Sequence, residues 1–425
     1  MIVLVRGFWF IGFALTIIAG FSACLKQASP PESSAGAAPA PEPSPPAPAV
    51  PDTLVIVAAG DNLFHTPMIR PPQDDAPYNF TPFYAPVKHL VEAADIAFIN
   101  QETLLAGKNF GFSGYPRFNT PQEAGDALIA TGFTVINHAN NHVMDKGEKA
   151  VFATMDFWDA RPEITYLGIR RSQEKRNIPA IIEKNGVKVG FLAYTYGTNG
   201  LPVPKDKPYL VSLLDTAVMA AEIDALRPLC DFLVVSLHWG NEYQHTLSGQ
   251  QKTVSAFLAE HNVDLIVGHH PHVLQSAASL PRKDGKTALC FYSLGNFISA
   301  QDTNATLLGG LLFLKLKKTS ANLAVTQAGV IPVVTHYEQG FTNFRVYPLY
   351  DYSEKLAEKH RNKSRSNLNL PYLNTLAEDI LGTYLINYNP FACNPFAENL
   401  LPLEKNLEDS VPLADSASSE KKEKN

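Results

Sequence analysis

The chain has 425 residues, of which 45% are hydrophobic, 10% aromatic and 18% charged. This composition excludes a wholly disordered chain and supplies enough apolar side chains for a large core. The formal net charge of −6, without a Lys/Arg stripe interleaved with aromatic residues, argues against a nucleic-acid partner. Four cysteines over this length exclude a disulfide-stapled scaffold.

The N-terminal segment predicts export and attachment to a membrane. The apolar residues 8–21 follow Arg6 and are fewer than the roughly 20 that a spanning helix needs, which is typical of a secretory signal peptide, here residues 1–23. The small residues before Cys24 resemble a bacterial lipoprotein cleavage site, with Cys24 as the lipidated residue. We therefore expect an exported, membrane-anchored lipoprotein that faces the periplasm or the cell exterior. An uncleaved N-terminal anchor helix is the alternative.

Two further segments are expected to lie outside the folded part. Residues 24–52, which begin at the lipidated cysteine, are rich in Pro, Ala and Ser, a composition that favours a semi-rigid linker. Residues 404–425 are polar, lack aromatic side chains and are predicted to be disordered. Cys230, Cys290 and Cys393 have no Cys or His neighbours at metal-binding spacing. We expect them to be inert buried thiols, and one disulfide is the alternative.

Between these segments, short apolar runs alternate with longer amphipathic ones. Strands are predicted at 54–60, 95–100, 133–137, 231–237 and 264–267, with a hairpin at 180–194 that turns at Asn185-Gly186. Helices are predicted at 82–94, 121–132, 147–159, 215–227 and 250–261. This alternation predicts a mainly α/β fold with mixed sheets over residues 53–349, in which residues 309–349 close a second sheet. Residues 350–403 are predicted to be a helical C-terminal extension, with Leu373, Leu376, Ile380 and Tyr384 on one face.

Side chains of the metal-ligand type follow five of the predicted strands. They are Asp61, Glu102, Asn141, His238, His270 and His272. Open α/β sheets bind ligands outside the carboxyl ends of their strands. Residues two apart in an extended segment project from the same face, so His270 and His272 are expected to point into one site. This mixed oxygen and nitrogen set, without a thiolate, favours one or two divalent ions of Mn, Fe or Zn.

Several neighbours have two interpretations. Asp145 is expected to orient His142 or to cap the next helix, and Trp239 either packs in the core or stacks on substrate at the rim. Asn296 either supports a ligand or occupies a turn. The candidates for contact with substrate or with the ligands are Asn100, Thr103, Arg117, Trp239, Glu242 and Asn296. His269 is expected to be a neighbour of the site. The remaining histidines are expected to be structural or on the surface: His65, His89, His245, His261, His336 and His360.

The motifs that carry these residues resemble those of the CapA family of poly-γ-glutamate capsule biosynthesis proteins. The matching stretches are GDNLFH, FINQETLLAG, YPRFNTPQEAGDALIATGFTVINHANNH followed by VMDKG, SLHWGNEY, GHHPHVLQ and SLGNFI, and the resemblance covers about residues 54–300. It implies a layered α/β/β/α sandwich of mixed sheets similar to calcineurin-like metallophosphoesterases, with a helical C-terminal appendage. Leu63 and Thr103 depart from the phosphoesterase pattern, which has His at the first position and, in related two-metal phosphodiesterases, Asn at the second.

The resemblance also implies roles for the candidate residues. Asp61 and His272 would bind a first metal, Glu102 would bridge, and Asn141, His238 and His270 would bind a second. His142, together with Asp145, would be the catalytic group, with His142 as general acid in a metal-assisted hydrolysis or transfer.

The cellular role implied is the synthesis, export or anchoring of a poly-γ-glutamate-type polymer. The expected partners are an anionic polymer or phosphoester substrate, the membrane through the lipid anchor, and a capsule synthase complex, with no nucleic acid. Two alternatives remain: a non-catalytic, polymer-binding assembly factor, and a generic periplasmic metal-dependent phosphoesterase.

Overall fold

The computed structural model describes residues 52–72, 76–320 and 322–392. The predicted signal peptide, Cys24, the linker up to residue 51, Cys393 and the predicted C-terminal tail lie outside the described residues. Within these ranges, no helix combines the length and the apolar character needed to cross a membrane.

The first sheet contains the strand that leads to Asp61. Its order is β14 (Thr342–Pro348), β13 (Leu323–Glu338), β12 (Leu308–Lys318), β1 (Thr53–Asn62), β2 (Ile96–Gln101), β3 (Val135–Asn137) and β4 (Thr165–Leu167), and β11 (Asn296–Ile298) also pairs with β1. Strands β1 to β4 are parallel, whereas β12 runs antiparallel along β1 from Thr53 to Ala59. The prediction that residues 309–349 close a second sheet is wrong, because β12 covers the free edge of β1 and brings β13 and β14 into the first sheet.

The second sheet contains the strands that lead to the histidines predicted as metal ligands. Its order is β5 (Ala180–Lys184), β6 (Val187–Thr195), β7 (Phe232–His238), β8 (Leu265–His269), β10 (Thr287–Phe291) and β9 (Ala277–Pro281). Strands β6, β7, β8 and β10 are parallel, and β5 and β9 are antiparallel edges. The predicted hairpin is confirmed, since Asn185 and Gly186 both have positive φ angles, 51° and 69°, at its turn.

Seven α-helices of the described residues precede the last three strands of the first sheet. They are α1 (Thr81–Tyr84), α2 (Lys88–Glu92), α3 (Glu123–Thr131), α4 (Glu148–Asp159), α5 (Gln173–Arg176), α6 (Thr216–Leu226) and α7 (Gly249–Glu260). The single helix predicted at 82–94 is instead two short ones, because Pro86 lies between them and has no N–H to continue a helix. The predicted stop of α3 is confirmed at Gly132, where φ is 107°.

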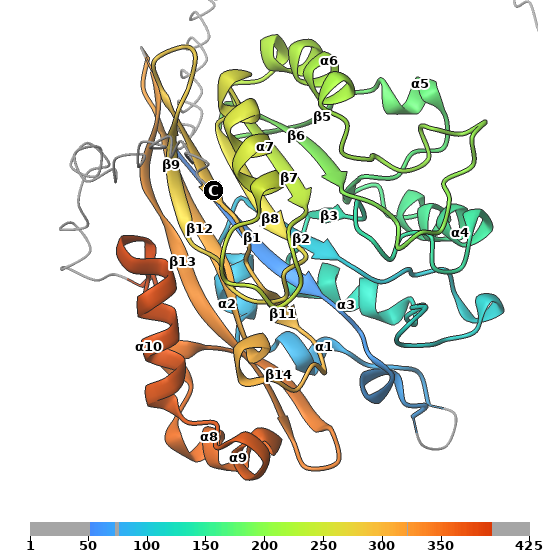
Figure 1. The fold of residues 1–425 in the computed structure, drawn as a ribbon, viewed down its shortest axis with the longest axis vertical. Helices are drawn as coiled ribbons and strands as arrows, with labels where there is room; N and C mark the ends of the chain where they lie inside the picture. The colour runs from blue at the N-terminus through green and yellow to red at the C-terminus, as the bar shows by residue number, and fades with distance from the viewer. Residues whose placement is uncertain (1–51, 73–75, 321, 393–425) are drawn as a thin grey trace, which may run out of the picture. The chain divides into compact units, whose positions relative to one another are not determined.

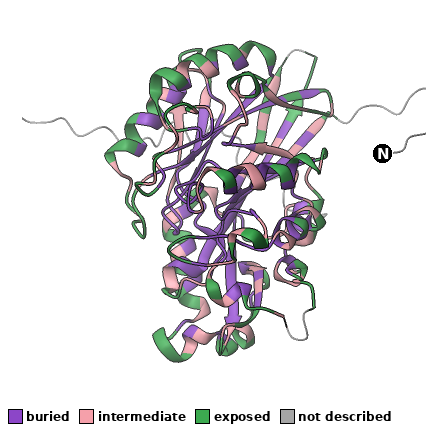
Figure 2. Cartoon of the chain, turned by 90° about the vertical axis from the view of Figure 1, so that its right-hand side faces the viewer, coloured by how far each residue is buried: buried purple, intermediate pink, exposed green. Residues whose placement is uncertain are grey.

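Alternate burial along β7 reveals the layers of the fold. Phe232 and Val234 belong to the core shared with the first sheet, whereas Leu233 and Val235 pack with the buried faces of α6 and α7. In Figure 1, α6 and α7 accordingly lie beside β6 and β7, and α10 (Leu370–Leu381) lies beside β13. Figure 2 shows that burial follows the strands, while the exposed surface lies mainly on helices and loops. The predicted layered sandwich of mixed sheets is confirmed.

The C-terminal segment is helical, as predicted, and packs on the first sheet. It contains α8 (Glu354–Lys359), α9 (Arg361–Ser366) and α10. The buried face of α10 carries Leu373, Ala377 and Leu381, whereas Leu376 and Ile380 are only partly buried. The backbone N–H of Ile386 donates to the Val330 carbonyl, which attaches the end of the segment to β13.

Candidate metal centre

The carboxyl ends of strands from both sheets meet at one buried cluster. Asp61 ends β1 and Glu102 follows β2, while His238 ends β7 and His270 and His272 follow β8. All five side chains are at most 3% exposed. Two groups each have ligand atoms within 4.8 Å of one another: Glu102 with His270 and His272, and Glu102 with Asp61 and His238. Glu102 is common to both groups.

His270 and His272 converge for a reason other than the expected one. The chain is not extended here: their φ angles are 97° and 58°, in the left-handed region. Non-glycine residues adopt this region at a cost of about 1–3 kcal/mol, which the surroundings must offset. One such contact is the hydrogen bond that the His270 backbone N–H donates to Asp61 Oδ2 at 3.3 Å. A turn therefore brings the two rings to 5.9 Å, and the extended geometry predicted from the sequence is wrong.

The tautomer of His272 is set by its neighbours. Its Nδ1 lies 3.1 Å from Asp61 Oδ2 and 3.1 Å from Asn296 Oδ1, and both oxygens are acceptors. Nδ1 therefore carries the donated proton, and Nε2, which lies 3.7 Å from Glu102 Oε1, is the ring atom available to a cation. Burial disfavours the charged imidazole, but Glu102 and Asp61 outweigh it and raise the pKa of His272 to about 9. The two carboxylates thus favour the charged imidazolium, and a cation bound at Nε2 would take the place of its second proton.

Glu102 is the strongest indication that the cluster fits a metal ion. Neither of its carboxylate oxygens has a hydrogen-bond partner among the described residues, although the side chain is fully buried. Burial raises the pKa of Glu102 well above its ordinary value; the charge of His272 opposes this rise and that of Asp61 adds to it. The Nδ1 atom of His270 is also buried without a partner. A buried, unpaired carboxylate is costly unless it is paired or binds a metal, so the donor set fits a divalent cation.

Amide side chains hold His238 and Asp61 in place. His238 Nε2 lies 2.8 Å from Asn141 Oδ1, and Asn141 Nδ2 in turn donates to Asn199 Oδ1 at 3.2 Å. Asn100 donates through Nδ2 to Asp61 Oδ1 at 2.8 Å, and its Oδ1 accepts from Asn137 Nδ2. Burial lowers the pKa of His238 well below its ordinary value, so the ring is neutral and retains a lone pair. Asn141 and Asn100 therefore both touch the cluster.

His142 and Asp145 form a pair beside the metal cluster. His142 Nδ1 donates to Asp145 Oδ2 at 2.8 Å, and the same oxygen accepts from the Phe118 backbone N–H at 2.7 Å. Asp145 therefore orients His142, which leaves Nε2 of His142 as the atom free for proton transfer. The alternative that Asp145 caps the next helix is wrong, because α4 has Gly147 at its N-cap and no side-chain cap.

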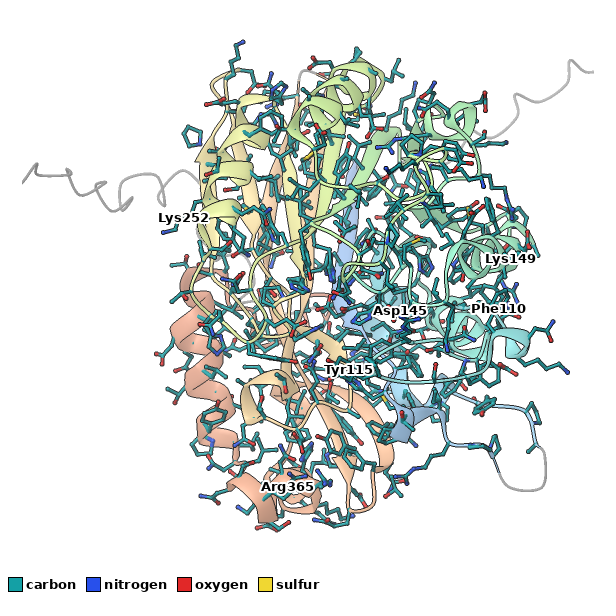
Figure 3. All side chains as sticks on the ribbon, turned by 45° about the vertical axis from the view of Figure 1, so that its right-hand side comes forward. Phe110, Tyr115, Asp145, Lys149, Lys252 and Arg365 are labelled. Carbon is teal, nitrogen blue, oxygen red and sulfur yellow. The ribbon has the colours of Figure 1, made fainter. Side chains whose placement is uncertain are left out.

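A cavity of about 700 Å³ gives access to this pair and to His272. The candidate residues Arg117 and Glu242 lie in its wall, as does Leu63. Figure 3 labels Tyr115 and Asp145, which lie on the loops after β2 and β3, and both line the cavity. Tyr115 is 74% exposed and marks the rim.

Sequence reasoning missed part of this wall. The residues missed are His65, Tyr115, Phe118, Asn199, Tyr243 and Gln301. His65 was expected to be structural, yet it lines the cavity, and the Phe118 ring stands edge-on to both His65 and His142, at 5.4 and 4.6 Å. The available signal was its place in GDNLFH, four residues after Asp61. Tyr115 and Phe118 lie in the matching stretch YPRFNT and Tyr243 in SLHWGNEY, so these three also had a signal. Asn199 and Gln301 lie on loops whose mutual approach has no local sequence pattern.

Three residues predicted to contact the substrate or the ligands make other contacts: Trp239 and Thr103 face away from the cluster, and Asn296 supports His272. Trp239 is fully buried and donates its indole N–H to the Tyr292 carbonyl at 2.9 Å, so it packs in the core and the stacking interpretation is wrong. The Thr103 hydroxyl accepts from Gln101 and pairs with Thr120, which turns it away from the cluster. Asn296 contacts His272 directly and also donates to Gln301 and the Thr306 carbonyl, so it supports a ligand.

The remaining predicted positions are structural. His269 is fully buried, with Nδ1 3.5 Å from Asp61 Oδ1, and is a neighbour as expected. Cys230 and Cys290 are buried free thiols. This agrees with inert cysteines rather than with a disulfide between these two.

The amino-acid sequence matches the profile of the bacterial capsule synthesis protein PGA_cap over residues 55–301, more than half of the chain. The chain belongs to the PGA_cap family. It is 32% identical over 201 residues to the PGA biosynthesis protein CapA of Bacillus subtilis (strain 168), which covers 47% of this chain and 51% of that protein. It is also 32% identical over 191 residues to the capsule biosynthesis protein CapA of Bacillus anthracis, covering 44% of each. The predicted resemblance is confirmed, and the match spans about half the length of these relatives.

The solved structures whose fold is similar to that of this PGA_cap chain are distant from it in sequence. A 5′-nucleotidase precursor from Thermus thermophilus is 15% identical with a TM-score of 0.42, covering 66% of this chain and 54% of that one. The calcineurin-like phosphoesterase YfkN from Bacillus subtilis is 16% identical with a TM-score of 0.40, covering 66% and 90%.

Proposed function

We propose that this PGA_cap chain acts in making, exporting or anchoring a poly-γ-glutamate-type capsule polymer, as a metal-dependent hydrolase or transferase. The names of the two curated relatives, PGA biosynthesis protein and capsule biosynthesis protein, support the cellular role. The observation that carries the chemical part is Glu102, a buried carboxylate without a hydrogen-bond partner, surrounded by Asp61 and three histidines. The substrate we propose is either an anionic polymer or a phosphoester.

The residues that would hold the cation are Asp61, Glu102, His238, His270 and His272, together with Asn141, whose Oδ1 lies 2.8 Å from His238 Nε2. Oxygen and imidazole donors without a thiolate favour Mn, Fe or Zn, as one ion or as two that share Glu102. A divalent ion, when bound, supplies Lewis-acid polarisation and positive charge for an anionic reacting group. This local charge matters because the chain as a whole is negatively charged.

The chain's own acid in this proposal is His142. Asp145 fixes its Nδ1 proton, so a second proton on Nε2 would face the cavity and could pass to a leaving group. Arg117 lies in the wall of the same cavity with a solvent-exposed side chain, a suitable position for binding an anionic substrate. His142 would therefore transfer the proton, and Arg117 would hold the polymer.

The test is metal content followed by activity of the full chain in detergent. The wild type should purify with bound Mn, Fe or Zn and hydrolyse bis(p-nitrophenyl) phosphate. Replacing both His270 and His272 with alanine should remove the metal. His142→Ala should keep the metal and lower the rate about 10²- to 10⁴-fold, because a general acid contributes in that range. A wild type that purifies without metal and takes up none on addition of these ions would overturn the proposal.

A second candidate, a non-catalytic polymer-binding factor, is favoured by one observation. Leu63 lines the cavity wall near the metal cluster, an apolar side chain where a phosphoesterase pattern has a histidine. If this candidate is correct, His142→Ala leaves capsule formation intact, whereas Arg117→Ala impairs it. The two variants, compared in cells that make the polymer, separate the two candidates.

We also propose that the chain is tethered outside the cytoplasm through a lipid on Cys24, with a capsule synthase as partner. The support is the N-terminal sequence, in which a short apolar segment leads to Cys24 and a Pro-rich linker follows. Cys24→Ser should move the protein from the membrane fraction to the soluble extracytoplasmic fraction. An unchanged distribution would favour an uncleaved anchor helix.

A further inference from the structure

A second cavity lies where α5 and α6 meet β4 and β6. Its volume is about 560 Å³, within the range of small-molecule sites, and it shares no lining residue with the cavity at the metal centre. Nothing in the proposed hydrolase chemistry uses it. It therefore calls for a separate explanation.

Most of the wall is apolar. Phe191, Leu192 and Ala193 of β6 contribute to it. Ile178, after α5, and Val218, on α6, also line it, although they are 55% and 38% exposed. Large aliphatic side chains left open to solvent beside a cavity gain free energy when an apolar ligand covers them. The wall thus suits a ligand with an apolar body.

One charged side chain in this wall has unused donors. Arg170 Nη1 donates to the carbonyls of Tyr166 and Ile169, at 3.0 and 2.9 Å, which fixes the guanidinium. Its Nε and Nη2 have no acceptor among the residues that the structure describes. Burial lowers the pKa of Arg170 from its ordinary value, although Tyr166 and Glu222 act in the opposite direction. A fixed guanidinium whose Nε–H and Nη2 amino group are both free is suited to a carboxylate.

The acidic side chain in the same wall, Glu222, already accepts hydrogen bonds on both of its oxygens. Glu222 accepts from Arg176 Nε at 2.6 Å and from the Tyr194 hydroxyl at 2.6 Å, one bond on each oxygen. Arg170, Arg176 and Glu222 together leave one positive charge in the wall. A ligand with a single negative charge would balance it.

We propose that this cavity binds a small organic monoanion with an apolar body, for which a medium-chain carboxylate is the simplest form. The carboxylate pairs with the free edge of the Arg170 guanidinium, and the apolar part covers β6, Ile178 and Val218. This site is independent of the metal centre and of the proposed function.

The test is calorimetric titration of the full chain with octanoate, below its micelle-forming concentration and at fixed ionic strength. Saturable binding to one site is expected, and octan-1-ol and octylammonium should not compete. Arg170→Gln should weaken octanoate binding at least about tenfold, because it removes a charge-assisted bidentate contact. Arg345→Gln is the matched control, since Arg345 also donates to a backbone carbonyl but lies outside this wall.

A second variant tests the same proposal if Arg170→Gln does not fold. Ala225 is exposed on α6 and lines the cavity, so Ala225→Trp fills the space while Arg170 remains. It should abolish octanoate binding, and His270→Ala should leave it unchanged. The proposal is overturned if octanoate shows no saturable binding, if octan-1-ol binds equally well, or if the cavity-filling variant binds as the wild type does.

Discussion

At the scale of single residues, the centre depends on Glu102. It belongs to both groups of candidate ligands, and its oxygens have no donor among the described residues. Two buried carboxylates in one cluster repel each other unless positive charge lies between them. Removing the charge of Glu102 should therefore alter how the protein responds to metal more than it alters the packing.

We predict that Glu102→Gln abolishes the stabilisation by metal. A ligand that binds only the folded state at 100 times its dissociation constant adds about 2.7 kcal/mol. A chelator should therefore lower the unfolding temperature of the wild type and leave that of Glu102→Gln nearly unchanged, as measured by calorimetry. Glu242→Gln, which changes an exposed acid of the cavity wall, is the control and should respond as the wild type does. An equal response of wild type and Glu102→Gln would contradict a bridging role.

His65 offers a second prediction at this scale. His65 Nδ1 lies 3.3 Å from the Ala300 backbone N–H, which can only donate, and 3.3 Å from the Leu63 carbonyl, which can only accept. Burial, followed by the charge of His272, lowers the pKa of His65 to about 4, so the ring is neutral. In the tautomer in which Nδ1 accepts from Ala300, Nε2 carries the proton and can donate to a bound anion. His65→Asn keeps an acceptor for Ala300 but lacks an atom at Nε2, whereas His65→Gln places an amide near Nε2.

The Asn variant should therefore bind inorganic phosphate roughly 10-fold or more weakly, as expected for a lost hydrogen bond to a charged group, and the Gln variant should recover part of the affinity. Calorimetry on the metal-loaded protein measures both, and metal content should stay constant. Equal affinity of the Asn variant and the wild type would assign His65 a purely structural role.

The convergence of these side chains in one cluster could be predicted because their signal is local. Asp61, Glu102, His238 and His270 each follow a buried apolar run, and parallel strands deliver their carboxyl ends to a common edge. The left-handed turn at His270 and His272 had no such signal, since it depends on contacts with Asp61, 209 and 211 positions away in the chain. The same limit hid Asn199 and Gln301, which reach the cavity from separate loops.

At the scale of elements, two glycines let strands approach closely just before ligands. A Cβ on Gly60 would lie 2.0 Å from the Gly295 carbonyl oxygen, and one on Gly268 would lie 1.8 Å from that of Tyr292. Both distances are too short for a real side chain. These glycines therefore set how deeply Asp61 and the histidine turn enter the centre.

We predict that Gly268→Ala lowers the free energy of unfolding by roughly 1–3 kcal/mol, the usual cost of forcing extra volume into a packed core. It should also weaken metal binding, because β8 must move away from β10. Denaturant titration and metal competition measure the two effects. Gly249→Ala, at the start of α7, is the control, since its Cβ would meet no atom within 4 Å. Similar stabilities of the two variants would contradict this role for Gly268.

The elements themselves were largely predictable, and the exceptions have physical causes. The strands, the Asn185-Gly186 hairpin and the helix stop at Gly132 follow local rules. Local rules do not determine the sheet that β12 joins, because an apolar strand pairs equally well with any free edge. Only the register from Thr53 opposite Lys317 to Ala59 opposite Leu311 settles that it joins β1.

At the scale of the whole molecule, the C-terminal helices attach to the first sheet through a buried histidine pair. The rings of His336 and His360 lie 5.4 Å apart. His360 Nε2 donates to the Thr335 carbonyl, and its Nδ1 accepts from the Asn362 backbone N–H at the start of α9. Burial lowers the pKa of His336 to about 4 and, together with the charge of His336, that of His360 to about 3. Both rings are therefore neutral in the folded state at pH 7.

This pair predicts a loss of stability in mild acid. Unfolded histidines take up protons near pH 6.5, and the folded pair does so only near pH 4 and below, so the unfolded state binds more protons between these values. The free energy of unfolding should fall as pH decreases through this window, by roughly 2 kcal/mol per histidine at pH 5. Glu338, 3.9 Å from His336 Nε2, opposes the effect, while Lys359, Arg345 and Arg361 reinforce it.

His360→Asn isolates this contribution. Asparagine is a good helix N-cap, so it can replace the acceptor for Asn362 without titrating. The variant should be less stable at pH 7, because it loses the bond to Thr335, but its stability should depend less steeply on pH. Urea unfolding at pH 5 and pH 7 gives both slopes, and parallel slopes would contradict the assignment.

The division of the centre between two sheets has a consequence for when a cation can enter. Asp61 and Glu102 come from the first sheet and the three histidines from the second, so the chain must be synthesised through His272, and both sheets assembled, before the donors meet. A nascent chain that ends before His272 lacks at least one of the five donors. Which metal ion the protein acquires would then depend on the ions present where folding finishes, rather than on those present at the ribosome.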